Sequence, residues 1–423
     1  MKVAVYGSDL TAWVAAASLA KVGNNVQVLD ITTSEALPIH KISALRDEPG
    51  LLDQIELQIA EGRLTNAVSD EDVAAVDVHW LALQASEYNQ AKTIVKKLAK
   101  AKPANLLIIN QCNFDVGATD KLQTLLNVES NQAAVYIPDN LQEGKALQGF
   151  NSPKRIILGT DSDWALTITK ALIRPFSQSL EHLKMMSARE AEFTKFAVTG
   201  MLAIRLGYIN ELANLADELD VDIDIIREGM GTDPRIGHHY LFPGCGFGGQ
   251  NFQEYISRFS DIFQKNRHSS LLKTVIEQNE VQKELLFRKL WQHYQADLSG
   301  KTVTLWGASF KPGTASIDNA PSLRTIEALV AQNVTVQVHD PEALNNLEAY
   351  FGNEPLISYF EDPYEAANAS DAILLMTEWP EYWSPDYEQL ITRMRNPVLL
   401  DGRNIFDKKA LESYGFIYLG IGR

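Results

Sequence analysis

Near its start the chain reads Lys2-Val3-Ala4-Val5-Tyr6-Gly7-Ser8-Asp9-Leu10-Thr11-Ala12, an apolar run that leads through a glycine into a helical pattern. The run over Val3–Tyr6 predicts a buried strand, Gly7 a tight turn, and residues 10–22 a helix. This order of elements is typical of the first unit of a doubly wound α/β sheet. The first residues therefore favour a folded strand over a secretory signal.

Further apolar runs, separated by segments of helix length, extend the predicted sheet. They lie at Asn25–Leu29, Val78–Leu83, Leu106–Ile109, Ala134–Ile137 and Arg155–Leu158. Strands separated in this way indicate parallel pairing. The second run ends at Asp30, 23 residues after Gly7, which suits an acidic residue that binds a ribose hydroxyl.

A helical period replaces this alternation in the middle of the chain. Apolar residues recur at threes and fours from Ala188 to about Leu219, and a second long helix is predicted from about Ser269 to His293. A second strand–turn pattern starts at Lys301 and reaches Gly307. Three further strands are predicted at Val334–Val338, Ala372–Met376 and Val398–Leu400.

The predicted fold class is thus α/β, with two Rossmann-like doubly wound domains joined by a central spine of long helices. We predict an N-terminal domain over residues 1–187, a central helical dimerisation region over 188–298, and a C-terminal domain over 299–423. A chain of 423 residues is long enough for two or three such cores.

Composition narrows the possible partners. The chain is 45% hydrophobic and 22% charged and has a net charge of −16, which argues against nucleic acid as a partner. No apolar run approaches the roughly 20 residues that span a bilayer. Two cysteines, Cys112 and Cys245, form no disulfide framework and suit a cytoplasmic protein. No metal site is expected.

The first turn departs from the dinucleotide-binding pattern Gly-x-Gly-x-x-Gly, in which pyrophosphate rests on backbone N–H groups. Gly7 occupies the first glycine position and Ala12 the third, but Asp9 occupies the second. Unit charges about 4 Å apart repel by roughly 4 kcal/mol at an effective dielectric constant near 20. Alternatively, Asp9 is simply the N-cap of the helix, which places the cap in the anion site itself.

A second glycine-rich loop reads Pro243-Gly244-Cys245-Gly246-Phe247-Gly248-Gly249-Gln250-Asn251-Phe252-Gln253-Glu254-Tyr255. Its glycines would allow the backbone to approach a ligand closely. Such loops normally present a reactive side chain, yet none of the residues that follow the glycines is a nucleophile. Cys245 is interpreted as a small buried hydrophobe, and less readily as a displaced nucleophile.

Together these features resemble the UDP-glucose/GDP-mannose dehydrogenase family, particularly its UDP-glucose 6-dehydrogenase branch. The resemblance extends over nearly the whole chain, although no single motif is decisive. The motifs are Glu48-Pro49-Gly50-Leu51, Gly62-Arg63-Leu64, Leu141-Gln142-Glu143-Gly144, Ile209-Asn210-Glu211, Asp233-Pro234-Arg235-Ile236-Gly237, the glycine loop, Phe310-Lys311-Pro312, Thr377-Glu378-Trp379, Asp401-Gly402-Arg403-Asn404 and Ile421-Gly422-Arg423.

The resemblance implies oxidation of a sugar C6 alcohol by NAD through a cysteine-bound intermediate. It places the family cysteine at Asn251, whose amide is neither nucleophilic nor displaceable. The family lysine and aspartate that follow fall on Glu254 and Tyr255. By the same resemblance the remaining catalytic positions are Lys195, Asp139 and Thr199, the last in place of an asparagine.

The cofactor positions implied by the resemblance are Gly7, Ala12 and Asp30. NAD binding is placed in doubt by Asp9, by Gln84-Ala85-Ser86 where the family has a Gly-Thr-Pro loop, and by Asp318 in place of an arginine that reaches NAD. Gln111-Cys112-Asn113 replaces a loop that orients water and cofactor.

The nucleotide-sugar positions are better retained. The resemblance implies contacts with a UDP-sugar from Leu141, Gln142, Glu143, Tyr240, Gly248, Lys311 and Arg403, with Arg235 reaching from a second subunit. Lysine and arginine are suitable partners for a diphosphate. Alternatives remain open: Lys311 as a solvated charge, Lys195 in a helix-face ion pair, and Arg403 as a structural partner of Asp401.

We therefore expect a catalytically impaired family member in polysaccharide precursor metabolism. It would form a homodimer and act by binding a nucleotide sugar or by pairing with an active relative. Two alternatives are an active NAD-dependent oxidoreductase, performing the full or the first-step oxidation, and a purely structural scaffold. The wider hydroxyacid dehydrogenase group fits less well, because it does not explain the second α/β domain.

Overall fold

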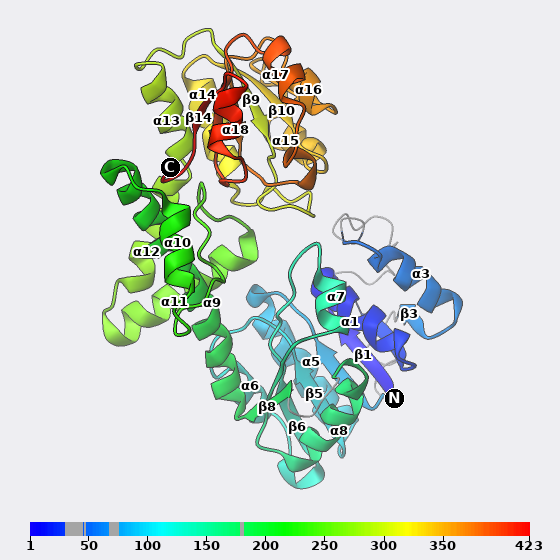
Figure 1. Ribbon diagram of the computed structural model, residues 1–423. Helices are drawn as coiled ribbons and strands as arrows, with labels where there is room; N and C mark the ends of the chain where they lie inside the picture. The colour runs from blue at the N-terminus through cyan, green and yellow to red at the C-terminus, as the bar shows by residue number, and fades with distance from the viewer. Residues whose placement is uncertain (30–44, 46–47, 67–75, 178–181) are drawn as a thin grey trace. The chain divides into compact units, whose positions relative to one another are not determined.

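The computed structural model describes residues 1–29, 45, 48–66, 76–177 and 182–423. It divides into two compact units, Met1–Ala197 and Val198–Arg423 (Figure 1). Each unit is built around one sheet. None of the described helices combines the length and the apolar character that crossing a bilayer requires.

The first unit contains an eight-stranded sheet in the order β3-β2-β1-β4-β5-β6-β7-β8. The strands are β1 (Lys2–Tyr6), β2 (Asn25–Leu29), β3 (Leu64–Asn66), β4 (Val78–Leu81), β5 (Leu106–Asn110), β6 (Gln132–Tyr136), β7 (Ile156–Gly159) and β8 (Leu183–Met186). The predicted parallel pairing is confirmed among β2, β1, β4, β5 and β6. Strand β3, which was not predicted, also pairs parallel with β2.

Strand β7 departs from the prediction, because it runs antiparallel to β6 and parallel to β8. The chain leaves β6 at the carboxyl edge of the sheet and enters β7 from that same edge. The amino ends of β7 and β8 therefore lie at the edge where β1, β4, β5 and β6 end.

Successive side chains of a strand point to opposite faces of the sheet, so alternate residues pack in two core layers. Val3 and Val5 pack in the layer formed with helices α1 (Leu10–Lys21), α3 (Leu51–Ala60), α7 (Ala146–Asn151) and α8 (Asp163–Ile173). Ala4 and Tyr6 face the layer with α5 (Tyr88–Ala101) and α6 (Ala118–Gln123). Helices thus cover both faces of this sheet.

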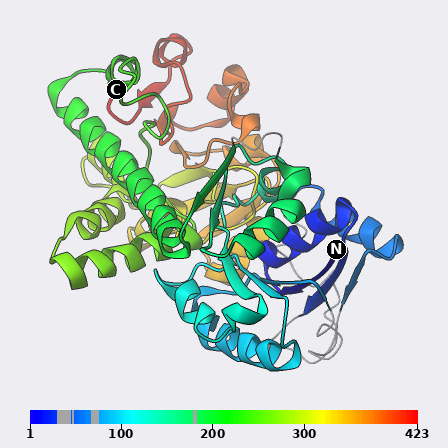
Figure 2. The same ribbon diagram turned by 90° about the horizontal axis from the view of Figure 1, so that it is seen from below.

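Helix α9 (Ala188–Leu219) is a single long helix, as predicted for that range (Figure 2). It carries residues of both compact units. The second predicted helix is instead two, α12 (Leu271–Gln282) and α13 (Leu285–His293). The break follows Lys283, whose side chain is only 1% exposed and donates to Asn319 Oδ1 at 2.6 Å.

The second unit contains a six-stranded parallel sheet in the order β11-β10-β9-β12-β13-β14. Its strands are β9 (Thr302–Trp306), β10 (Thr335–His339), β11 (Ile357–Phe360), β12 (Ala372–Leu375), β13 (Val398–Asp401) and β14 (Ile417–Leu419). Its other helices are α10 (Ile223–Gly231), α11 (Gln250–Arg267), α14 (Pro321–Ala331), α15 (Leu344–Phe351), α16 (Pro363–Ala366), α17 (Tyr387–Arg393) and α18 (Lys408–Ser413).

Candidate functional site

In the first unit, the turn after β1 passes close to the end of β4. Gly7 has φ +142°, and a Cβ atom added there would lie 2.1 Å from the carbonyl oxygen of Ala82. A side chain at this position would clash with the backbone. Packing within the sheet therefore accounts for Gly7, whether or not a ligand approaches it.

Asp9 is the N-cap of α1, as the sequence allowed. Its Oδ1 atom accepts a hydrogen bond from the backbone N–H of Ala12 at 3.2 Å. Burial, with a smaller contribution from the charges of Asp139 and Glu87, raises the pKa of this carboxyl to about 6, although the hydrogen bond from the Ala12 N–H opposes the shift. The carboxylate thus occupies the helix N-terminus, where an anionic ligand would otherwise bind.

Asp139 and Glu87 add negative charge to the same turn. Asp139 Oδ2 accepts from Thr11 Oγ1 at 3.2 Å. Gln84 is the N-cap of the short helix η2 (Ala85–Glu87), and its N–H donates to Glu87 Oε2 at 2.8 Å. Three carboxylates around one turn do not fit a pyrophosphate group. Asp30 lies outside the described residues.

Lys195 and Asp139, both implied by the family resemblance, are brought together in the first unit. Lys195 Nζ donates to the backbone oxygen of Asp139. Burial lowers the pKa of the lysine, and the Asp139 carboxylate opposes that shift. An amine whose pKa is lowered in this way releases its proton more readily than a lysine in water. Thr199 follows four residues later on α9 and is also buried.

Glu48 anchors the segment that carries Leu141, Gln142 and Glu143. Its buried carboxylate accepts from the N–H groups of Gly144 at 2.7 Å and Leu147 at 3.1 Å. Asp139 Oδ1 accepts from Leu141 N at 3.0 Å. The segment is thus fixed at both ends. Glu48 belongs to one of the family-like motifs, but nothing in the sequence indicates that its carboxylate binds these backbone N–H groups.

Cys112, in the segment that replaces the family's water-orienting loop, is buried, and its sulfur accepts from Leu83 N at 3.2 Å. Burial raises its pKa well above the usual value. A thiol in this state is not an activated nucleophile.

In the second unit, side-chain amides hold the backbone of the glycine loop. Asn279 accepts from Phe247 N at 2.8 Å and donates to Phe247 O at 2.9 Å. Asn210 Oδ1 accepts from Gly244 N at 2.9 Å, and Gln282 Nε2 donates to Gly244 O at 2.8 Å. These bonds preorganise the loop.

The glycines of this loop face other parts of the protein. An added Cβ at Gly248 would lie 2.7 Å from Asn319 O, and one at Gly249 would lie 3.0 Å from the ring of Phe310. Gly249 N also donates to Asp318 O at 2.8 Å. Close packing therefore explains these glycines, and the expected approach to a ligand is not needed to account for them.

Asn251 lies on the first turn of α11 and is exposed. Glu254 is also exposed and accepts from Gln250 Nε2 at 2.7 Å, whereas Tyr255 is buried. Cys245 is fully buried, and burial raises the pKa of its thiol. Its interpretation as a buried hydrophobe is confirmed.

Arg403 lies beside this loop, with its guanidinium 3.1 Å from the ideal Cβ position of Gly244. Its Nε donates to Met376 O at 2.8 Å and lies 3.1 Å from Glu378 Oε2. Asp401 accepts from the backbone N–H of Arg403 instead. The guanidinium is therefore paired with Glu378, and Asp401, the alternative partner, holds the backbone of Arg403.

Lys311, Arg235 and Tyr240 are the remaining nucleotide-sugar candidates. Lys311 is half-buried, with Nζ 5.3 Å from the ring centroid of Phe310. The Arg235 side chain is 86% exposed and is paired with Asp233 at 2.6 Å. Tyr240 has φ +58° and is exposed. Among the residues that the structure describes, no cluster of ligands suits a metal ion.

Three models of the UDP-glucose/GDP-mannose dehydrogenase family match the chain in order. Residues 1–177 match the NAD binding domain, residues 189–281 the central domain, and residues 304–408 the UDP binding domain.

Curated relatives and solved structures agree with these matches. The UDP-glucose 6-dehydrogenase of Pseudomonas aeruginosa is 32% identical over 100% of this chain and 98% of its own length. UDP-glucose 6-dehydrogenase TuaD of Bacillus subtilis is 30% identical over 100% and 93%. A UDP-glucose dehydrogenase from Pyrobaculum islandicum superimposes with a TM-score of 0.84 at 26% identity, covering 100% of this chain and 97% of that chain.

Proposed function

The chain belongs to the UDP-glucose/GDP-mannose dehydrogenase family, and we propose that it binds a nucleotide sugar without oxidising it to the acid. The observation that carries this proposal is Asn251, an exposed amide at the position where the resemblance places the family's nucleophilic cysteine. A carboxamide can neither form nor release a covalent thioester. The buried thiols of Cys112 and Cys245 offer no substitute.

The retained nucleotide-sugar residues support the binding half of the proposal. Arg403 and Lys311 supply positive charge in the second unit, next to a glycine loop whose backbone is hydrogen-bonded at Gly244 and Phe247. In the first unit, Asp9 and its neighbouring carboxylates oppose the pyrophosphate of NAD. We therefore propose that NAD binds weakly, and that the protein senses a UDP-sugar or pairs with an active relative.

Calorimetry with UDP-glucose and NAD, together with a coupled assay for NADH, tests this function. We expect saturable binding of UDP-glucose, weak binding of NAD and no UDP-glucuronate. Replacing Asn251 by cysteine restores only the missing thiol, so a matched comparison of this variant with the natural chain isolates its contribution. Formation of the acid at an ordinary rate by the natural chain would contradict the proposal.

One observation favours a second candidate, a single two-electron oxidation of the sugar alcohol. Lys195 remains buried against Asp139, and hydride removal itself needs a base but no thiol. On this alternative the natural chain would form NADH and an aldehyde in equal amounts, which an aldehyde-trapping reagent would reveal.

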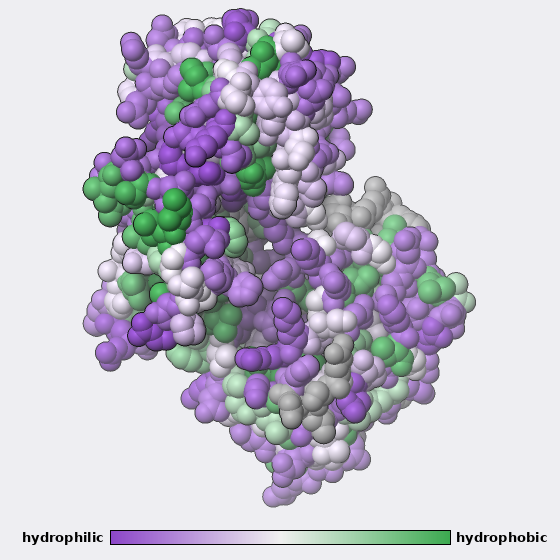
Figure 3. Space-filling view, viewed as in Figure 1, coloured by the Kyte–Doolittle hydropathy of each residue, from purple (hydrophilic) through white to green (hydrophobic). Residues whose placement is uncertain are grey.

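We also propose that two copies associate through α9. Met201, Tyr208 and Leu215 repeat at heptad spacing on that helix and are all exposed, Met201 by 57%. Figure 3 shows further apolar surface around α10, to which the exposed Ile225 belongs. A repeated apolar stripe on a long helix is typical of helix pairing between subunits.

A double substitution tests this association. Replacing Met201 and Tyr208 by aspartate places two charges in the stripe, and we expect light scattering to show a shift from dimer to monomer. Replacing Leu57, an exposed residue of α3, by aspartate is the control and should leave the mass unchanged. A monomeric natural chain would refute the proposed association.

A further inference from the structure

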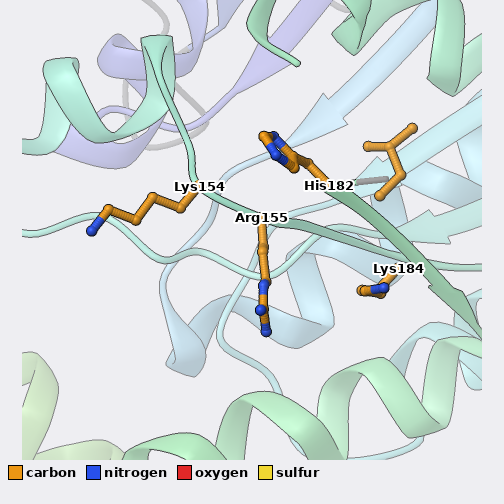
Figure 4. Close-up of a pocket in the computed structure, with 5 residues that line it drawn as sticks. Lys154, Arg155, His182 and Lys184 are labelled. Carbon is orange, nitrogen blue, oxygen red and sulfur yellow. The ribbon is translucent and has the colours of Figure 1, made fainter. Parts of the chain in front are cut away.

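The first unit contains an open cavity of about 690 Å³ that no role described above uses. Four of its five lining residues are basic: Lys154, Arg155, His182 and Lys184 (Figure 4). The fifth, Leu183, is the first residue of β8. None of these five described residues carries a carboxylate.

Strand direction places these basic residues at the ligand-binding edge of the sheet. Tyr136, at the end of β6, lies opposite Gly159, at the end of β7, in an antiparallel pair. Arg155, which precedes β7, therefore reaches the edge where the chain leaves β6 toward Asp139. Ile156 of β7 lies beside Leu183 of β8, which brings the start of β8 to the same edge.

Register also places two of the cations on one face of the sheet. Lys184 pairs with Ile157, and paired residues of neighbouring strands point to the same side. Arg155 precedes Ile157 by two residues and so shares that side. In Figure 4 the four basic side chains extend in different directions from two neighbouring segments of the chain and do not converge on one point.

The charges at this hollow are not neutralised within the described part of the chain. Lys154, Arg155 and Lys184 are exposed, and no described carboxylate forms an ion pair with them. Asp9 and Glu87 follow β1 and β4, which lie near the middle of the same sheet. The protein has a net charge of −16, yet its first unit has a cationic site. This site lies away from the turn after β1, where dinucleotide-binding domains usually bind pyrophosphate.

We propose that this hollow binds a small molecule that carries a diphosphate. Arg155 and Lys184 lie on one face of neighbouring strands, so each can bind one of two linked phosphates. Arg155 can bind a phosphate with two parallel hydrogen bonds, while the lysines act as point charges. This inference rests on residues around β7 and β8 and uses none of the nucleotide-sugar candidates of the first unit, Leu141, Gln142 and Glu143.

Inorganic pyrophosphate is a suitable probe, because it carries the diphosphate and no base or sugar. Calorimetry on the full chain should show saturable binding that weakens with salt, and weaker binding of orthophosphate. Replacing both Arg155 and Lys184 by glutamine should weaken pyrophosphate binding by at least about tenfold. Replacing Lys96 and Lys100, two exposed lysines of α5, removes equal charge and should leave the affinity unchanged.

A second measurement locates the bound anion. Acetylation of lysines, followed by mass spectrometry, should show that pyrophosphate protects Lys154 and Lys184 but leaves Lys96 reactive. Equal pyrophosphate affinity in the Arg155→Gln/Lys184→Gln variant, or equal protection of all three lysines, would overturn the proposal. So would binding of long polyphosphate without measurable binding of pyrophosphate. Retained UDP-glucose binding in that variant shows that the nucleotide-sugar site is intact.

Discussion

Replacing Asp9 by glycine is expected to strengthen NAD binding by about 100- to 1000-fold, as measured by calorimetry. The substitution removes a carboxylate from the helix N-terminus, where repulsion of about 4 kcal/mol corresponds to roughly three powers of ten in affinity. Glycine is a tolerated N-cap and costs only about a few tenths of a kcal/mol there. The Asp9 backbone, with φ −90° and ψ −178°, is accessible to any residue.

Two further variants show whether the charge of Asp9, and not its hydrogen bond, weakens NAD binding. Asp9→Asn keeps an oxygen for the hydrogen bond from Ala12 N and loses the charge, so it should recover most of the gain. Asp163→Asn removes a first-turn carboxylate from α8 and should change nothing. Equal NAD affinity in the natural chain and both Asp9 variants would refute this explanation.

The same carboxyl predicts a dependence on pH. Its pKa in the folded protein is about 6, above the ordinary value of 3.8, so the folded state holds the proton more tightly. Stability from Asp9 is therefore present at low pH and decreases as pH rises from about 4 to about 6, by about 3 kcal/mol in all. Asp9→Asn should lose this dependence, and NAD affinity of the natural chain should rise as pH falls through about 6.

Replacing Asn279 by leucine is expected to lower the free energy of unfolding of the second unit by about 3–5 kcal/mol. The change leaves the N–H and the carbonyl of Phe247 without their partner, and each buried unpaired group costs about 1–3 kcal/mol. We also expect UDP-glucose binding to fall by at least about 100-fold, because the glycine loop loses its fixed geometry.

The matched control is Asn266→Leu, on the exposed side of α11, where the amide bonds only to Ile262 O. Chemical denaturation and calorimetry should leave this variant close to the natural chain. Asn279→Asp retains an acceptor for Phe247 N–H but no donor, so an intermediate loss is expected. Unchanged UDP-glucose affinity in a destabilised Asn279→Leu protein would contradict the role assigned to the loop.

The strands and the long helix were predictable where their hydrophobic period is strong. Asn25–Leu29 and Ala188–Leu219 coincide with β2 and α9. Strand β8, with the sequence Leu-Lys-Met-Met, has no such alternation. Strand β7 was predicted, but its antiparallel pairing with β6 was not, because strand direction is set by tertiary pairing. Helix α11 was missed because polar residues dominate its first turn.

The sequence showed which family positions carry a changed residue, but it did not show the contacts around those positions. Asp9 could be identified as a cap because its place before a helical run is informative by itself. Glu48 and Asn279 bond to backbone groups 96 and 32 residues away, and nothing local marks such partners. The loop glycines were likewise predicted to face a ligand, whereas Asn319 packs against Gly248 and Phe310 against Gly249.

The two buried cysteines give the molecule an internal reporter. Cys112 belongs to the first unit and Cys245 to the second, and each is shielded from solvent. A thiol reagent applied in a short pulse can therefore modify either sulfur only after its own unit opens. Peptide mapping of the modified protein would give a separate opening rate for each half of the chain, without any engineered label.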